Sequence, residues 1–585
     1  MKTLVGSSLL VLASALAASA FVSHINESGQ VRHWNLGPNY DPDVATNVLD
    51  QATGAIRYSL AADAYSATNT VAELDAIRAA FAQWQAVPGT RLKFEEGGLV
   101  GPGVNDVALD DRNVVFWVKH STLVNGGWDD IRGLPSVTYV WTFDDNTIVE
   151  ADIVLNGVDF NWITDFRTGR TDSVWVESTL LHEIGHLLGL EHSPVGGATM
   201  LWHEMGGVTP RAGLSSDEFC AVRHLYPPWN PPPPTAGTLR GQVMAGATRA
   251  FGAAVFAEDA AGNTVAGTVT WTNGVYELPA LPAGSYRVRV APLDPRNSLQ
   301  ALVRGEDIHV AYTNALTSFL PTTNKPVTLI AGGAATVDFN LVRVEPAFRI
   351  SHLRPPAADP NALHIIRTPF SLSLGASDVF LGVYGASLPT SNAQLTVTGD
   401  GVTVGETRFW PAAQPQLNLV QVSISLASNA TPGLRSLVLQ QGTNVAYANG
   451  FLEISPAFPD WNFDGLDDRF QRRYFPLFTA TNAAPVADPD QDGFNNLAEY
   501  EAGTDPSEAH SFPFRITGLK PAPAGTTLTF QTGLKDRYQV LRRPDFAPNS
   551  WQPVGPLIQP TGISSQFMDP TATNGSHFYR VQAVP

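Results

Sequence analysis

The chain has 585 residues, which is long enough for several domains. Its formal net charge of -18 excludes nucleic acid and anionic membranes as main partners. The single cysteine, Cys220, excludes an internal disulfide, so hydrophobic cores must hold the chain together, and bound metal is a further candidate. The 50 glycines and 44 prolines, beside only 15% charged residues, favour many β-modules joined by turns.

Residues 1–20 have the features of a secretory signal peptide. Lys2 supplies a positive charge, an apolar stretch follows, and residues 18–20 read A-S-A, a small-residue cleavage site. The apolar stretch is too short for a membrane anchor, and no later stretch is long and apolar enough for a membrane span. We therefore expect cleavage after Ala20 and a secreted, extracellular protein.

Alternating strand and helix patterns fill residues 21–228. An amphipathic helix is expected over 70–85, because apolar residues recur there at spacings of three and four. A second helix is expected over 174–188. A closing helix over 214–225 would begin at a Ser215 or Ser216 cap. Runs rich in β-branched and aromatic residues predict strands at 56–60, 91–95, 114–119, 139–143 and 149–155.

The second of these helices carries a metal-ligand pattern. His182 and His186 are four residues apart, which puts both rings on one helix face, where they can bind one zinc ion. Gly189 can adopt a positive φ, so it suits the end of the helix and lets His192 return as a third ligand. Three neutral histidines leave a fourth position for water, which is typical of a catalytic zinc site. Glu183 lies beside the ligands, where it can take a proton from that water.

The complete pattern, H-E-x-x-H-x-x-G-x-x-H, is the long zinc signature of the metzincin peptidases. Among them, residues 30–228 most resemble the matrixins, because Ser193 follows the third histidine and the segments 214–218 and 225–226 match the matrixin closing helix. The resemblance implies an α+β metzincin catalytic domain with a five-stranded twisted sheet and a zinc helix. It also implies one catalytic zinc ion, bound by His182, His186 and His192.

The resemblance assigns further roles. Glu183 would be the general base, Met200 would form the Met-turn beneath the zinc site, and Asp217 would brace that turn by hydrogen bonding. The strand over 137–143 would be the sheet edge to which a protein or peptide substrate adds as an extra strand. Residues 194–211 would wall the pocket for the side chain that follows the scissile bond.

Some features depart from the matrixin pattern. No cysteine precedes the catalytic domain, so we expect no cysteine-switch latency, and Cys220 is interpreted as a small buried residue. Only His120 is available for the structural zinc ion of animal matrixins, so no second zinc is expected. His203 is a rival metal ligand, but His192 is better placed. Several acids either bind calcium or are solvated loop residues: Asp106, Asp110, Asp111, Asp129 and Asp130.

The Pro-rich residues 229–236 are predicted to be a stiff linker. After it, residues 237–345 have a strand-rich pattern with an Asn273-Gly274 hairpin signal, and they resemble the carboxypeptidase-regulatory-like β-sandwiches. Residues 346–457 resemble an immunoglobulin-like β-module, and residues 512–585 form a C-terminal β-module. No catalytic pattern is visible in them, so we expect spacers or modules that bind protein or polysaccharide.

Residues 458–511 contain two acidic loops. The second loop, residues 488–499, fits D-x-D-x-D-G-x5-E, which is the EF-hand calcium loop. An ordinary acidic turn is the alternative. The calcium ligands would be the side chains of Asp488, Asp490, Asp492 and Glu499 and the carbonyl of Phe494.

The first loop repeats this pattern with Asp460, Asn462 and Asp464, but Gln471 stands at its twelfth position. Because the twelfth residue normally supplies both oxygens of a glutamate, the first site should be weaker or empty. The pair of loops resembles thrombospondin-type-3-like or dockerin-like repeats, which implies a structural role for calcium.

The sequence thus predicts a multidomain protein. It would combine an α+β metzincin catalytic domain with β-sandwich modules and a small calcium-binding segment. We expect a secreted zinc endopeptidase that hydrolyses peptide bonds in extracellular proteins. The alternative is a surface-binding or adhesive protein with an idle metzincin domain. The complete ligand set and the intact Glu183 favour the enzyme, whereas a groove blocked by the chain's own loops would favour the alternative.

Overall fold

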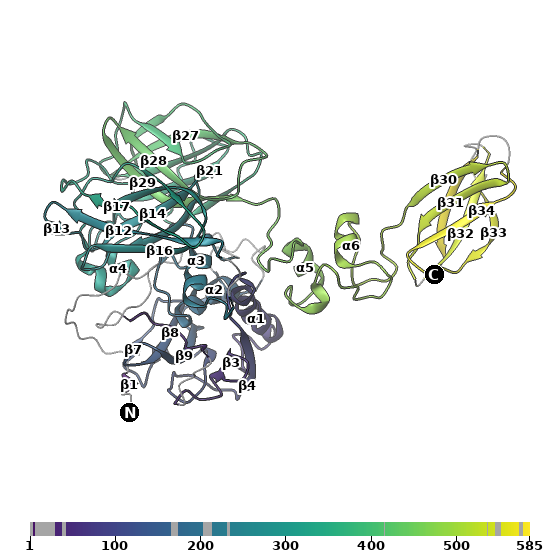
Figure 1. Cartoon of the computed structure of the whole chain (residues 1–585), viewed down its shortest axis with the longest axis horizontal. Helices are drawn as coiled ribbons and strands as arrows, with labels where there is room; N and C mark the ends of the chain where they lie inside the picture. Colours follow the sequence, from purple (N-terminus) through teal and green to yellow (C-terminus); the bar gives the residue numbers. More distant parts are fainter. Residues whose placement is uncertain are drawn as a thin grey trace. The chain divides into compact units, whose positions relative to one another are not determined.

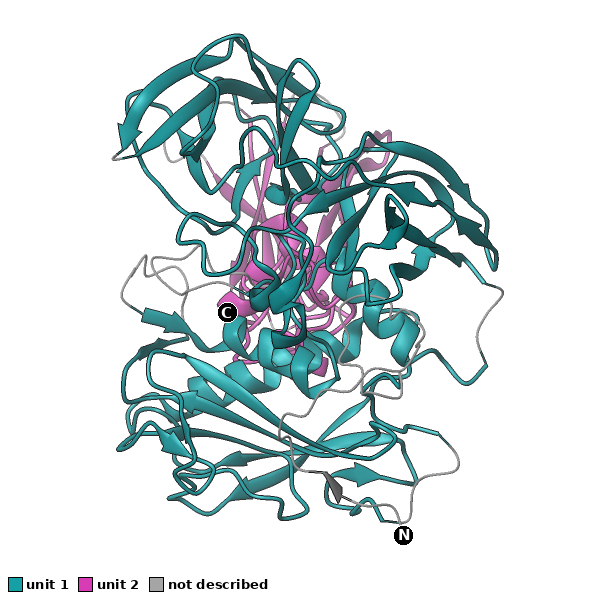
Figure 2. Cartoon of the chain, turned by 90° about the vertical axis from the view of Figure 1, so that its left-hand side faces the viewer, with its two compact units in different colours: residues 1–457 teal, residues 458–585 magenta. Residues whose placement is uncertain are grey.

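The computed structural model describes ten stretches of the chain: 4–5, 30–37, 43–164, 173–202, 213–230, 234–414, 416–534, 536–544, 551–572 and 577–584. The chain divides into two compact units, residues 1–457 and residues 458–585, which Figure 2 colours separately. Within the described stretches, no helix is long and apolar enough to cross a bilayer.

Unit 1 begins with a sheet that carries helices on one face. Its long strands are β3 (Ala55–Ala61), β4 (Phe94–Val100), β5 (Val114–Val118), β8 (Ser136–Phe143) and β9 (Ile148–Asn156). The order is β8-β9-β5-β3, and β4 also pairs with β3. Only β8 runs antiparallel to its long neighbour, so β8 forms an edge of this five-stranded core.

Two short strands extend this sheet to seven strands, so the prediction of five was wrong in number. They are β1 (Leu4–Val5), which pairs with the far end of β8, and β2 (Leu49–Asp50), which pairs with β3. Such two-residue pairings depend on where the chain passes in space, so no periodicity in the sequence marks them. Smaller sheets contain β6 (Leu123–Val124) with β7 (Asp129–Asp130), and β10 (Asn161–Ile163) with β11 (Ser173–Trp175).

Three helices lie between this sheet and the β-sandwich that follows in the chain (Figure 1). They are α1 (Thr70–Ala86), α2 (Val176–Leu187) and α3 (Ser216–Leu225). The buried face of α1 includes Leu74, Ile77, Phe81 and Trp84, as the spacing predicts. Ser215 caps α3 in a capping box with Glu218.

Residues 236–340 form a β-sandwich, called here the second module. One sheet contains β12 (Ala236–Ala245), β13 (Thr248–Arg249), β16 (Val275–Pro282), β19 (Ala334–Thr336) and β20 (Phe339–Asn340). The other contains β14 (Ala253–Asp259), β15 (Thr264–Val269), β17 (Gly284–Pro292) and β18 (Lys325–Leu329). The connection from β17 to β18 carries the short helices α4 (Gly305–Ile308) and η2 (Val310–Asn314).

Residues 352–455 form another sandwich, called here the third module. Its first sheet contains β21 (His352–Ala357), β23 (Val379–Gly385), β25 (Val402–Val404), β26 (Arg408–Gln414) and β27 (Leu417–Leu426). Its second sheet contains β22 (Phe370–Ser373), β24 (Gln394–Val397), β28 (Gly433–Gln441) and β29 (Asn444–Ser455).

Two hydrophobic cores cross the predicted domain limits within unit 1. The larger core runs from Trp34 to Leu341 and joins the helical layer to the second module. The other contains Val195, Ala198 and Leu201, which follow the zinc signature, together with apolar residues of both β-modules. The Pro-rich segment 229–236 therefore connects parts of one compact unit, and the division between units comes after Ala457.

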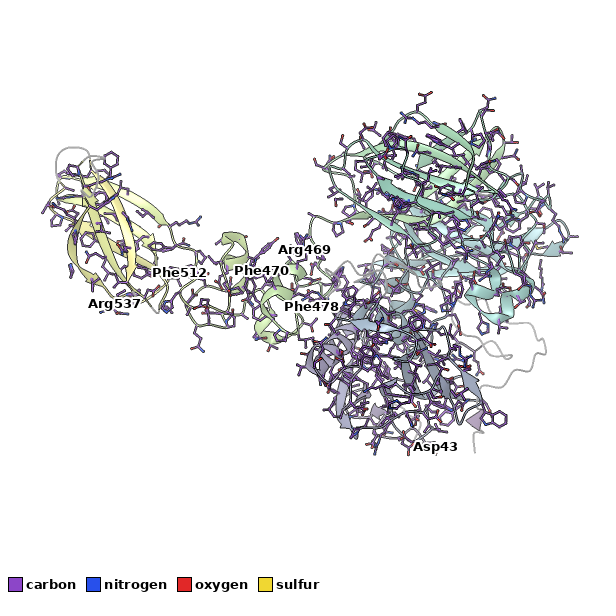
Figure 3. The ribbon with its side chains drawn as sticks, turned by 180° about the vertical axis from the view of Figure 1, so that it is seen from behind. Asp43, Arg469, Phe470, Phe478, Phe512 and Arg537 are labelled. Carbon is purple, nitrogen blue, oxygen red and sulfur yellow. The ribbon has the colours of Figure 1, made fainter. Side chains whose placement is uncertain are left out.

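Unit 2 begins with the two acidic loops and ends in a small sandwich. Its helices are α5 (Asp468–Tyr474), η3 (Thr481–Ala483) and α6 (Asn496–Ala502). One sheet of the sandwich contains β30 (Ile516–Ala522), β31 (Gly525–Gln531) and β34 (Ser564–Asp569). The other contains β32 (Arg537–Arg543), β33 (Gln552–Ile558) and β35 (Phe578–Val584). Phe494 of the second loop stacks on Phe512 in the sandwich core, and Phe512 is labelled in Figure 3.

Candidate metal centre

The helix that carries the zinc signature is held at its C-terminal half by three buried aromatic side chains. The indole N–H of Trp84 donates to the Leu181 carbonyl, and that of Trp34 donates to the Leu187 carbonyl, both at 2.9 Å. The Tyr226 hydroxyl donates to the carbonyl that follows, at 2.7 Å. The carbonyls of Leu187 and Leu188 lie at the end of the helix, where carbonyls lack partners within it, so Trp34 and Tyr226 satisfy them. The contact of Trp84 in the middle of the helix adds a third anchor.

The three histidines of the signature converge at one point. Their ring centroids lie 4.8–5.1 Å apart. His182 Nδ1 donates to the Thr199 carbonyl and His186 Nδ1 to the Leu190 carbonyl, both at 2.8 Å. His192 Nδ1 donates to a carbonyl at 2.6 Å. Because a carbonyl can only accept, each Nδ1 carries the hydrogen, and each Nε2 presents a lone pair.

This arrangement fits a zinc ion. The Nε2 atoms of His182 and His186 are 3.2 Å apart. Two nitrogens at the usual Zn–N distance on a tetrahedral ion would be about 3.3 Å apart. One ligand atom from each of the three histidines lies within 4.8 Å of the others. Burial of the His192 ring away from water, and then the two neighbouring imidazoles, hold the pKa of His192 well below its usual range, which keeps this ligand neutral.

Gly189 and Met200 have the local conformations that such a centre needs. Gly189 has φ +93°, which L side chains rarely adopt, and a Cβ there would also overlap the Arg32 carbonyl. Met200 is 2% exposed. Its side chain lies against the zinc helix at Gly185, where a Cβ would overlap the Met200 sulfur. Met200 therefore forms a floor between the two helical ligands.

The predicted role of Asp217 needs correction. The carboxylate that accepts from the Met200 N–H, at 3.0 Å, belongs to Glu218. Asp217 instead accepts from the Ser193 hydroxyl at 2.7 Å and from the Gly267 N–H of β15 at 2.8 Å. Burial, and then the charge of Glu218, raise the pKa of Asp217 to about 8. Adjacent helix positions point in different directions, so the sequence could not say which acid reaches the turn.

The general-base candidate is held by two hydroxyls from the edge strand β8. Ser136 donates to one carboxylate oxygen of Glu183 at 2.6 Å, and Thr138 donates to the other at 2.5 Å. Glu183 is 5% exposed. Hydrogen bonds to a charged acceptor are strong, so the pair restricts the orientation of this carboxylate. Neither residue was among the sequence candidates. Thr138 lies on the strand predicted to bind substrate, over 137–143, and Ser136 lies directly before it, which was the only available signal.

Removing the two hydroxyls should lower turnover. In the double variant Ser136→Ala/Thr138→Val, we expect kcat to fall by about 10- to 100-fold with little change in KM, because the base loses its alignment. Steady-state kinetics with a quenched fluorescent peptide would measure both constants. Thr142→Val, at the other end of the same strand, is the matched control. An unchanged kcat in the double variant would show that the hydroxyls do not orient the base.

Two of the loop acids, Asp106 and Asp129, accept hydrogen bonds from the turn between β6 and β7 and from β8. Asp106 accepts the backbone N–H groups of Asn125 and Gly126. Asp129 accepts from the Asn125 side chain at 2.8 Å and from the Tyr139 hydroxyl at 3.2 Å. These hydrogen bonds fold the loop beside β8. The rival ligand His203 and the second half of the predicted pocket wall, residues 203–211, lie outside the described residues.

The two acidic loops of unit 2 differ in how their oxygens are satisfied. In the first loop, the Asp464 carboxylate accepts from the amides of Asn462 and Gln471, at 3.0 and 2.8 Å. Both oxygens of Asp460 accept backbone N–H groups of the loop. Amide donors thus occupy the positions where a cation would bind its ligands.

In the second loop, one oxygen of each acid at the cation-facing positions is buried without a hydrogen-bond partner: Asp488 Oδ1, Asp490 Oδ2, Asp492 Oδ2 and Glu499 Oε2. Burial, and then the charges of the neighbouring acids, raise the pKa of Glu499 to about 8 and that of Asp492 to about 6. Unpartnered buried carboxylate oxygens are costly, so this loop has the chemistry of an oxygen-ligand cation site.

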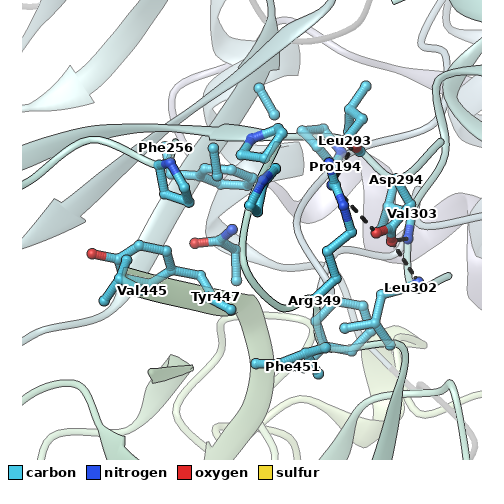
Figure 4. Close-up of a pocket in the computed structure, with 18 of the residues that line it drawn as sticks. Pro194, Phe256, Leu293, Asp294, Leu302, Val303, Arg349, Val445, Tyr447 and Phe451 are labelled. Atoms are coloured by element: carbon cyan, nitrogen blue, oxygen red, sulfur yellow. Dashed lines mark hydrogen bonds and ion pairs between the residues drawn. The ribbon is translucent and has the colours of Figure 1, made fainter. Parts of the chain in front are cut away.

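A partly open cavity of about 60 Å³ lies between the second and third modules (Figure 4). Pro194, Phe256, Tyr447 and Phe451 are among its lining residues, and none of the three histidines is. Its volume is enough for a few water molecules.

Comparison with known proteins adds one informative match. Residues 50–227 match the family model for matrixin, the M10 peptidases. Among solved structures, the chain is similar to the major pilin subunit of Bacillus cereus, with 8% identity over 60% of this chain and 88% of that one, at a TM-score of 0.14. It is also similar to the shaft pilin of Lactobacillus rhamnosus GG, with 11% identity over 38% of this chain and 100% of that one, at a TM-score of 0.14.

Structural similarity at these TM-scores supports no conclusion about fold or function. No curated protein matches the sequence. The matrixin match covers the zinc helix, the three histidines, Glu183 and the Met-turn, and it implies a zinc metallopeptidase. The match and the geometry together support a matrixin-like domain over residues 50–227.

Proposed function

We propose that this protein is a secreted zinc endopeptidase that hydrolyses peptide bonds in extracellular proteins. The observation that carries the proposal is the convergence of one ligand atom from each of His182, His186 and His192 within 4.8 Å, on the helix that also carries Glu183. The adjacent edge strand β8 supports it, because a peptide can add to a free strand edge through backbone hydrogen bonds. The matrixin match supports the metallopeptidase class.

His182, His186 and His192 would hold the zinc ion, which when bound acidifies water and polarises a carbonyl. Glu183 accepts the proton of the attacking water at a carboxylate oxygen and later delivers it to the leaving amine. Ser136 and Thr138 keep that carboxylate aimed during both transfers. Backbone groups of β8 align the substrate, which fixes the scissile bond against the base.

Secretion is proposed from the features of residues 1–20. The strand β1 lies in this segment and pairs with Thr142 and Phe143 at the outer edge of β8. Removal of the segment would leave that part of the edge without a partner strand, so signal cleavage and exposure of the substrate-binding edge would be the same event. We propose that the mature protein begins after Ala20.

The test is cleavage of an unstructured protein, such as reduced casein, by the purified full chain. We expect fragments to appear, a zinc chelator to stop the reaction, and added zinc to restore it. The reason is that only a bound zinc ion can activate the attacking water, and the three histidines alone cannot. Mass spectrometry of the fragments would establish internal cleavage. A folded, zinc-loaded chain that cleaves no protein would contradict the proposal.

The adhesive alternative with an idle metzincin domain predicts that last outcome. It is not favoured, because the ligand set is complete, Glu183 is in place and the matched family consists of peptidases. Binding of protein or polysaccharide by the β-modules stays a proposal, and it is compatible with either reading.

We also propose that the second acidic loop binds one calcium ion with a structural role. The unpartnered oxygens of Asp488, Asp490, Asp492 and Glu499 support this, and Phe494 would add its carbonyl. Phe494 packs in the sandwich core beside Phe512, so a bound cation would stabilise the contact between the loop and the sandwich. The first loop would stay empty, because the Gln471 amide already donates to Asp464.

Calorimetric titration of the full chain should give one calcium site. A ligand at about 100 times its Kd stabilises the folded state by about 2.7 kcal/mol, so unit 2 should unfold at higher urea with calcium present. Glu499→Gln should remove the site, whereas Gln471→Glu should create a second one in the first loop. Two sites in the wild type, or unchanged binding by Glu499→Gln, would contradict the assignment.

A further inference from the structure

The third zinc ligand is oriented by a segment outside the catalytic domain. The carbonyl that accepts from His192 Nδ1, at 2.6 Å, is that of Asp307 in α4, 115 residues further along the chain. His182 and His186 instead use carbonyls at Thr199 and Leu190, close to the signature itself. A carbonyl that accepts from the ring nitrogen away from the metal sets the tautomer and the direction of a ligating imidazole. One of the three ligands is therefore held by the second module.

The turn that presents this carbonyl is itself fixed by side chains. Arg304, at the N-cap of α4, forms an ion pair with the Asp307 carboxylate at 2.6 Å, and its backbone N–H donates to the same carboxylate at 2.7 Å. The Arg304 guanidinium also lies 5.5 Å from the ring centroid of Trp202, just after the Met-turn. Ile308 is buried in the same core as Leu201. The turn is thus locked and faces the zinc-site loop.

The loop between His192 and Met200 is built on both β-modules. Gly267 of β15 approaches so closely that a Cβ would press on Val195, and its N–H donates to Asp217. The Gly196 N–H donates to the Asn449 carbonyl of the third module at 2.8 Å. A Cβ at Gly196 would overlap the Phe451 ring. Glycine is needed at these positions because side chains of another module lie directly against the backbone there.

We propose that the Arg304–Asp307 turn of the second module is a positioning element of the zinc centre, which sets metal affinity by orienting His192 through the Asp307 carbonyl. This inference rests on the proposed zinc site. Its consequence is that the β-modules are part of the metal centre and that residues 21–228 alone lack a complete one.

The test measures zinc binding by the full chain, by competition with a chelator of known affinity. Loss of such a partner typically weakens metal binding about 10- to 100-fold. Arg304→Ala and Asp307→Ala keep the Asp307 backbone carbonyl but remove the ion pair that holds it in place, so each should weaken zinc binding by up to that factor. Asp307→Asn keeps an oxygen for Arg304 and should lose less. Arg296→Ala, on the same connection, removes an exposed arginine that pairs with Glu306 at 3.8 Å, and it should bind zinc as the wild type does.

The visible spectrum of the cobalt-substituted protein gives a second readout, because it reports ligand geometry. We expect altered bands in Arg304→Ala and Asp307→Ala only. The inference would be overturned if the folded variants had the zinc affinity and the cobalt spectrum of the wild type. It would also be overturned if the metal-free variants were less stable in urea while their cobalt spectrum was unchanged. If Asp307→Ala does not fold, Arg304→Ala decides. A wild type that fails to bind zinc would instead overturn the proposed zinc site.

Discussion

Glu183→Gln should retain bound zinc and lose almost all peptidase activity. General acid–base catalysis contributes about 10²- to 10⁴-fold to a rate, and a glutamine amide cannot accept the proton of the attacking water, so kcat should fall by that factor. Glutamine keeps the length of the side chain and an oxygen that can accept from Ser136. Bound metal should therefore be unaffected, since the three histidines are unchanged.

The experiment compares kcat and zinc content of the variant and the wild type, both as full chains. Glu95→Gln makes the same chemical change at an exposed position of β4, and it should leave both quantities unchanged. A Glu183→Gln protein with wild-type kcat would rule out Glu183 as the base. Loss of zinc together with activity would give Glu183 a role in metal binding instead.

Arg289→Ala should destabilise unit 1 by about 3–5 kcal/mol, because it leaves the buried Glu258 carboxylate without its buried partner. Arg289 is fully buried and forms an ion pair with Glu258 at 2.8 Å. Its other nitrogens donate across the module boundary to Asn449 at 2.9 Å and to Ser436 at 2.7 Å. The backbone carbonyl of Asn449 accepts from the Gly196 N–H in the zinc-site loop, so weaker zinc binding should accompany the loss of stability.

Urea unfolding of the full chain, followed by tryptophan fluorescence, would measure this effect. Arg287→Ala removes a half-exposed arginine from the same Glu258 carboxylate, and it should cost about 0–1 kcal/mol. The double variant Glu258→Gln/Arg289→Met should recover much of the stability, since replacement of both charges removes the unpaired one. Equal losses of unfolding free energy in the Arg289→Ala and Arg287→Ala variants would contradict a stabilising role for the buried ion pair.

The strands show where sequence patterns succeed and where they stop. The strand at 114–119 was predicted nearly to its ends, because β-branched and aromatic residues fill it. The strand predicted at 91–95 instead forms β4 over Phe94–Val100. Gly97 and Gly98 disfavour a strand locally, and parallel pairing with β3 supplies the hydrogen bonds that override this preference.

The acidic pair on α3 shows a different limit. Both Asp217 and Glu218 are consistent with a brace for the Met-turn, and the resemblance to matrixins implied that the brace is Asp217. Helix geometry directs Glu218 to the Met200 N–H, whereas Asp217 is directed to the second module. The direction of a side chain depends on how its helix is docked, which a one-dimensional pattern does not contain.

The sequence by itself was enough to predict the zinc ligands, the base and the calcium loop, because each prediction rests on a local spacing on one helix or one turn. The matrixin match over residues 50–227 agrees with the first two. Only the tertiary structure decided that Ser136 and Thr138 hold Glu183, that Asp307 holds His192, and that two β-modules support the Met-turn loop. These contacts join residues 45 or more positions apart in the sequence. They form only when the chain folds, so the local spacing of residues in the sequence does not predict them.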